Sequence, residues 1–132
     1  MILDELAALL ESWGVGTVGT DIFKGIMPDT PDVAVALLET GGDRPTRMLS
    51  PTDTALENPR IAIWARGAPD DYTGPRTKAQ SAFEALDNVR NDPVGGTRYL
   101  DAAPLQQPFL VSRDENSRVI IGFNVAVTKV PS

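Results

Sequence analysis

The chain has 132 residues, of which 42% are hydrophobic and 23% charged, a composition that suits one soluble domain around a single core. Its formal net charge of -6 argues against specific nucleic-acid binding, because that affinity comes from Lys and Arg side chains on a basic face. Cysteine is absent, which excludes disulfides and thiolate metal sites. Histidine is absent too, so the commonest general base is missing and catalytic triads of the serine or cysteine kind are excluded.

The start of the chain predicts neither export nor membrane insertion. Asp4 and Glu5 stand where a secretory signal would carry Lys or Arg. No apolar run approaches the roughly 20 residues that a membrane span requires. We therefore expect no membrane partner and a protein that stays in the compartment where it is made.

The first third of the chain predicts a helix, two strands and a loop. Apolar residues at spacings of three and four indicate an amphipathic helix that ends at Gly14 and Gly16. Its stripe comprises Ile2, Leu3, Leu6, Leu9, Leu10 and Trp13. Residues 21–25 and 33–38 predict strands that we expect to be antiparallel neighbours. Residues 40–58 are rich in glycine and proline without a sustained period, so they predict a long functional or mobile loop.

A strand and a second helix follow. Residues 60–66 alternate, with Arg60, Trp64 and Arg66 on one face of a strand that ends at Gly67. Asp70 or Asp71 is expected to cap the next helix, which has Pro75 in its first turn. Its buried stripe is predicted to comprise Ala79, Ala82, Phe83, Leu86 and Val89. Residues 91–93 are expected to stop the helix, and residues 97–100 to form a short strand.

The C-terminal fifth predicts a β-hairpin. Apolar residues occupy every second position of a long strand and are expected to face the core: Val119, Ile121, Phe123, Val125 and Val127. Phe109 and Val111 show the same alternation, and the polar residues 113–118 suit a tight reversal between the two strands. The element order predicts an α+β fold, a single domain over residues 1–132 in which both helices cover one face of a mainly antiparallel sheet.

Several of these segments resemble a family of long-tailed bacteriophage and prophage proteins, labelled minor capsid or tail terminator proteins. The matching pieces are a Pro-Phe run at residue 108, an Arg-Asp-Glu-Asn turn at 113–116 and a Phe-Asn-Val strand at 123–125. Glu-Thr-Gly-Gly at 39–42, the segment 58–67 ending in Arg-Gly, and Tyr72 at the start of a helix also match. The resemblance covers residues 33–127, and none of the matching residues implies catalysis.

The resemblance implies a structural role in the virion, after synthesis in the host cytoplasm. Such a protein forms a homohexameric ring on the completed tail tube, stops its polymerisation and provides the surface on which the head-tail connector docks. A ring needs complementary patches on each subunit and no cofactor or catalytic residue. The alternatives are another neck or head-completion protein, a small metal-dependent hydrolase, and a small-molecule-binding regulatory domain.

The candidate sites are surfaces rather than active sites. Asp70-Asp71 and Asp114-Glu115 are the best carboxylates for a cation, but their spacing does not fit a calcium loop, so capping and turn formation are the preferred interpretations. Aromatic and arginine side chains are enriched at protein interfaces. The predicted interface therefore combines residues of the long loop and of the 60–66 strand, namely Arg44, Arg47, Met48, Leu49, Arg60, Trp64 and Arg66.

Overall fold

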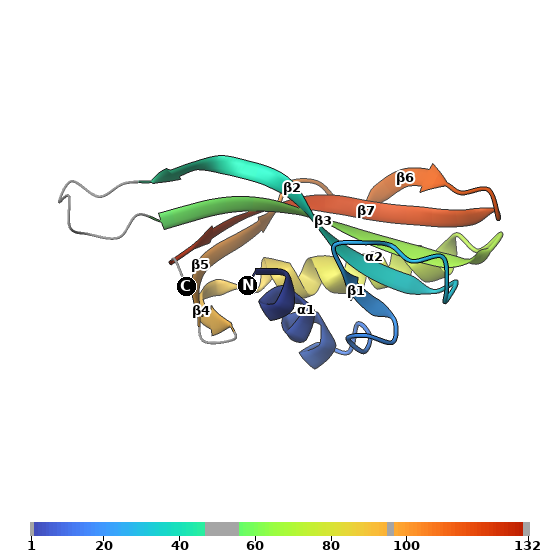
Figure 1. Ribbon diagram of the computed structural model, residues 1–132, viewed down its shortest axis with the longest axis horizontal. Helices are drawn as coiled ribbons and strands as arrows, with labels where there is room; N and C mark the ends of the chain where they lie inside the picture. Colours follow the sequence, from blue (N-terminus) through green and yellow to red (C-terminus); the bar gives the residue numbers. More distant parts are fainter. Residues whose placement is uncertain (1, 47–55, 95–96, 131–132) are drawn as a thin grey trace.

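Figure 1 shows a computed structural model that describes residues 2–46, 56–94 and 97–130. Its helices are α1 (Ile2–Ser12) and α2 (Thr73–Asp87). Its strands are β1 (Ile22–Lys24), β2 (Ala34–Thr46), β3 (Leu56–Pro69), β4 (Arg90–Val94), β5 (Thr97–Pro104), β6 (Phe109–Arg113) and β7 (Arg118–Lys129). The strands form one sheet in the order β1-β2-β3-β7-β5-β4, and β6 pairs with β7 beyond β5. Both helices lie on one face of this mainly antiparallel sheet, which confirms the predicted α+β fold.

The core lies between this face and the helices. Ile63 of β3 is the register partner of Phe123 of β7, and the Phe123 ring meets Phe83 of α2 edge-on with centroids 5.5 Å apart. The five alternating residues of β7 are each at most 1% exposed, as predicted: Val119, Ile121, Phe123, Val125 and Val127. The closing hairpin therefore supplies much of the apolar surface that α2 covers. Neither described helix is long and apolar enough to cross a membrane.

The first two strands are parallel, so the prediction of antiparallel neighbours is wrong. Ile22 is aligned with Val35, and Val35 N donates a hydrogen bond to Asp21 O. In a parallel pair the connection must run back along the first strand before the second strand can begin. The β1–β2 connection, residues 25–33, makes this return instead of a tight reversal, and this path brings it to the sheet face away from the helices.

Much of the segment predicted as a long loop is strand, which corrects the expectation for residues 40–58. β2 continues to Thr46 and β3 begins at Leu56, and together they form a hairpin arm that projects from one end of the sheet (Figure 1). The register slips between Glu39 and Gly42 because one extra residue is inserted in β2. Gly41 has φ of +98°, and a Cβ on Gly42 would lie 2.8 Å from Asn58 O. Bulges interrupt alternation, so the strand period was hidden in the sequence.

Other element boundaries also differ from the predictions. β3 passes Gly67 and ends at Pro69, and β5 extends from the predicted residues 97–100 to Pro104. The residue at the N-cap position of α2 is Tyr72, whose side chain makes no capping hydrogen bond. Asp71 supplies such a bond from one residue earlier, since its Oδ1 accepts from Gly74 N, so the predicted capping role falls to Asp71. The helix ends at Asp87, and residues 91–93 lie in β4 rather than at a helix stop. Pairing with β5 overrides the local signal of Pro93, which is tolerated because β4 is an edge strand.

Candidate assembly site

Trp64 lies on the sheet face opposite the helices, which we call the outer face. The register of β3 places Arg60, Trp64 and Arg66 there together, because the alternate residues Ile61, Ile63 and Ala65 point into the core. Trp64 is half-buried, and its register partner in β7 is Gly122. A Cβ at Gly122 would lie 2.8 Å from Trp64 Cδ1 and 2.5 Å from Ile63 O. Glycine at this position therefore leaves the room that the indole occupies beside β7.

Arg66, one of the predicted interface residues, is buried. Only 3% of the residue is exposed, while Arg60 at the other end of the row is exposed. Arg66 Nε donates to Asp32 O at 3.0 Å and Arg66 Nη2 donates to Pro31 O at 2.6 Å. Burial, and then the neighbouring charge of Arg118, lower the pKa of Arg66. Arg66 thus holds the β1–β2 connection against the sheet.

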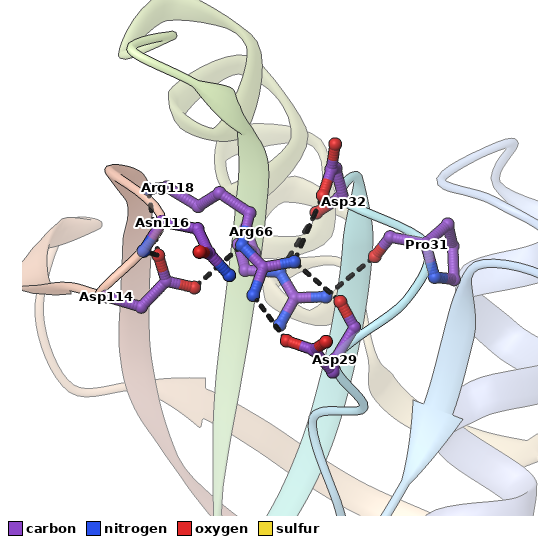
Figure 2. Close-up of polar contacts among 7 residues, drawn as sticks. All are labelled: Asp29, Pro31, Asp32, Arg66, Asp114, Asn116 and Arg118. Atoms are coloured by element: carbon purple, nitrogen blue, oxygen red, sulfur yellow. Dashed lines mark hydrogen bonds and ion pairs between the residues drawn. The ribbon is translucent and has the colours of Figure 1, made fainter.

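Arg118 is the centre of a charged cluster at the same end of the outer face (Figure 2). Its guanidinium donates to Asp114 Oδ2 at 2.7 Å, to Asp29 Oδ1 at 2.8 Å and to Asp32 Oδ1 at 3.0 Å, and it also donates to Asp29 O. The hydrogen bond to Asp29 contributes most to raising the pKa of Arg118, and this effect outweighs its burial. One side chain therefore ties the β6–β7 turn to the β1–β2 connection.

Asp114 holds the β6–β7 turn as well as Arg118. Its Oδ1 accepts hydrogen bonds from the backbone N–H groups of Asn116 and Arg118, and Ser117 completes the turn with φ of +60°. Burial alone would raise the pKa of Asp114, but the hydrogen bonds from Arg118 and Asn116 lower it overall. The prediction that Asp114 forms a turn is confirmed. Its ion pair with Arg118 is an additional role.

Asp70 and Asp71 also have local structural roles. Asp71 Oδ1 accepts a hydrogen bond from Gly74 N at 3.1 Å in the first turn of α2. Asp70 adopts φ of +63° and pairs with Arg113 at 3.6 Å. Within residues 2–46, 56–94 and 97–130, no group of three or more metal-ligating side chains is assembled. Beside a hollow of about 500 Å³, the carboxylates of Asp29 and Asp114 are instead paired with Arg118.

The hairpin arm includes part of the predicted interface. Arg44 lies in the arm portion of β2, and Arg60 lies at the base of the arm in β3. Arg47, Met48 and Leu49 lie outside the described residues. The Glu-Thr-Gly-Gly motif at residues 39–42 forms the first bulge, so the backbone geometry of the bulge explains why this motif occurs here. The arm and the Trp64 row are therefore separate parts of one sheet.

A family model described as "Bacteriophage tail terminator protein" matches residues 9–131. The chain belongs to this tail terminator family. It is a structural protein of the phage tail. The match includes α2, the arm and the closing hairpin, all of which lie in the segments that carried the resemblance in the sequence.

A solved structure agrees with this assignment at the level of the fold. The chain is similar to a chain of the structure titled "Virion of native gene transfer agent (GTA) particle", with a TM-score of 0.62. The alignment covers 96% of this terminator and 84% of that chain, at 15% sequence identity. At this identity the likeness shows a shared fold. No curated protein matches the chain.

Sequence reasoning missed the Arg118 cluster of this terminator. The sequence places Arg118 at the end of a predicted reversal, and no pattern in it singles out Asp29 or Asp32. Its three carboxylate partners come from positions 4, 86 and 89 residues away in the sequence. Only Asp114, at four residues, gave a local signal, namely an acid and an arginine at the two ends of a hairpin turn.

Proposed function

We propose that this terminator assembles as a six-fold ring on the completed tail tube, stops further polymerisation and provides the surface on which the head-tail connector docks. The observation that carries the proposal is the family match across residues 9–131. The protein would be made in the host cytoplasm and become part of the virion. The enzymatic alternatives have no comparable support, since the described acids serve the turn, the helix start and ion pairs.

A ring fits the composition of the outer face. A closed ring repeats one heterologous interface, which requires two different patches on each subunit. The outer face offers a half-buried tryptophan and an exposed arginine that no described helix covers. We propose that Trp64 and Arg60 contribute to subunit contacts. Arg66 would stabilise this surface by holding the β1–β2 connection in place.

The arm is our proposed contact with the tail tube. It projects beyond the body of the subunit, and two register shifts interrupt the pairing of its strands. Arg44, Arg47, Met48 and Leu49 combine charge with flexible apolar side chains, a combination suited to a protein interface. Contacts at the arm would leave the rest of the subunit available to the connector.

Tube growth tests the proposal directly. Tail tube protein is polymerised with and without the terminator, and tube lengths and ends are measured by negative-stain microscopy. We expect a six-fold ring at one end and no extension after more tube protein is added. The Met48→Asp variant should bind tube ends poorly. The control variant Leu105→Asp, which changes an exposed leucine outside the arm, should bind them like the parent. Tubes that continue to grow at ends carrying the protein would contradict the proposal.

A further inference from the structure

The β1–β2 connection, residues 25–33, is attached to the outer face mainly through two arginine side chains. None of its residues is buried. Within the part of the chain that the structure describes, residues 26–33 make no hydrogen bond between backbone groups. Arg66 instead donates to Pro31 O and Asp32 O, and Arg118 donates to Asp29 O. We call this connection the lid.

The lid places two carboxylates against the same pair of arginines. Arg118 Nη2 donates to Asp29 Oδ1 and Arg118 Nη1 donates to Asp32 Oδ1. Figure 2 shows the guanidiniums of Arg66 and Arg118 both directed at the lid. The two aspartates are exposed, although the arginines that they contact are buried. The lid is therefore held by charge and hydrogen bonds rather than by burial of its own side chains.

Arg66 and Arg118 require this negative charge because they are neighbouring cations. Burial, and then the charge of Arg118, lower the pKa of Arg66. Asp114 belongs to the β6–β7 turn and would stay with Arg118 if the lid moved away. Opening of the lid would leave two guanidiniums with one carboxylate, and guanidiniums bind carboxylates strongly through paired N–H donors.

Space for an incoming segment exists beside the lid. A hollow of about 500 Å³ lies between the lid and the β6–β7 turn. Both guanidiniums line it, and so do the side chains of Met27 and Ile120. Trp64 lies two residues before Arg66 on the same face of β3, so this hollow adjoins the surface that we propose for assembly.

We propose that the lid is an internal ligand of the Arg66–Arg118 pair, and that an acidic segment of an assembly partner binds the pair when the lid moves away. The lid shows which groups the pair accepts, namely two carboxylates three residues apart and nearby main-chain carbonyls. A tethered ligand competes at a high effective concentration, so the site is closed in the free subunit. The inference goes beyond the proposed ring and does not depend on the number of subunits.

Neutralising the lid tests whether its acids keep the site closed. The double variant Asp29→Asn with Asp32→Asn removes both counter-charges but leaves the backbone carbonyls that Arg66 contacts. Phenylglyoxal modifies accessible arginines, and peptide mapping by mass spectrometry reports each position. Arg66 and Arg118 should react slowly in the parent and about tenfold faster or more in the double variant. Circular dichroism confirms the fold, and Asp29→Asn alone is used if the double variant does not fold.

A second double variant is the matched control. Asp70→Asn with Glu115→Gln changes the net charge by the same amount, at two exposed acids outside the lid. Asp70 N donates to Ser117 O, so both positions lie at the same end of the subunit as the lid. Arg66 and Arg118 should remain protected in this control. Equal protection in the folded parent and the folded lid variant would overturn the proposed lid.

A synthetic peptide of the lid sequence, Met-Pro-Asp-Thr-Pro-Asp-Val, tests the ligand directly. Fluorescence polarisation should show that the lid variant binds it about tenfold tighter or more than the parent, because the internal competitor is weakened. The bound peptide should restore protection of Arg66 and Arg118 from phenylglyoxal, which locates it. A peptide with Asn in place of both Asp residues should not bind. Reactive arginines without peptide binding would overturn the assigned ligand, and tube capping, measured separately, would be unaffected by that result.

Discussion

Arg118 Nε donates a hydrogen bond to Asp114 Oδ2 over 2.7 Å, joining the first residue of β7 to the turn that precedes it. The Arg118 side chain is 5% exposed, while its partners Asp29 and Asp32 are 83% and 52% exposed. Asp114 is 24% exposed and is therefore its most enclosed partner. Solvent screens the exposed pairs, so Asp114 should contribute more than the other two carboxylates.

The first prediction compares the two acids of the turn. Asp114→Asn keeps the size of the side chain and an acceptor for the backbone N–H groups but removes the charge facing Arg118. We expect a clear decrease in melting temperature by circular dichroism, because a buried guanidinium loses its closest counter-charge. Glu115→Gln, at an exposed position of the same turn, should change it little. Equal melting temperatures for the two variants would show that the ion pair has no net effect.

The second prediction concerns acid pH. The pKa of Asp114 is lower in the folded protein than in the unfolded chain, so its contribution to stability is present above the unfolded value and is lost as pH falls through the folded value. Lys24 lowers the pKa of Asp4 in the same direction. The parent should therefore lose stability below about pH 4, and Asp114→Asn should lose less over that interval. Urea unfolding from about pH 5 to pH 2 provides the comparison.

Strong alternation made the hairpin predictable, whereas interrupted alternation concealed the arm. Along β7 each second residue is apolar and the strand pairs on both sides, so local pattern and tertiary packing agree. In β2 two register shifts, between Glu39 and Gly42 and between Asp43 and Thr46, interrupt the regular pairing, which removes the strand period from the sequence. The pairing partners of Arg118 were unpredictable because the parallel β1–β2 arrangement brings Asp29 beside it, and no local signal specifies that path.

The third prediction tests the core. Phe123→Ala removes a residue that is 1% exposed and packs against Phe83, so it should lower the free energy of unfolding by about 3–5 kcal/mol. That amount is a large share of the stability of a small domain. Phe109→Ala is the control, because Phe109 is 43% exposed, and it should cost much less in urea titrations. Similar losses for both variants would indicate that Phe123 is not a core residue.

The fourth prediction concerns the contact between α1 and β5. Tyr99 Oη donates to Glu5 Oε1 at 2.9 Å, and both residues are buried. Tyr99→Phe leaves the Glu5 oxygen without this donor and should lower the free energy of unfolding by about 1–3 kcal/mol. Tyr72→Phe removes the hydroxyl of the other tyrosine, which is 49% exposed, and should have little effect in the same urea titration.

The same hydroxyl predicts a loss of stability at alkaline pH. Burial, and then the hydrogen bond to Glu5, raise the pKa of Tyr99 above its ordinary value of 10.0. The folded protein keeps a proton that the unfolded chain releases near pH 10, so this contribution is complete below that pH and decreases as pH rises toward the folded pKa. Tyr99→Phe should remove this part of the slope, while Tyr72→Phe should retain it. Identical slopes for the parent and Tyr99→Phe above pH 10 would mean that the buried phenol does not stay protonated in the folded protein.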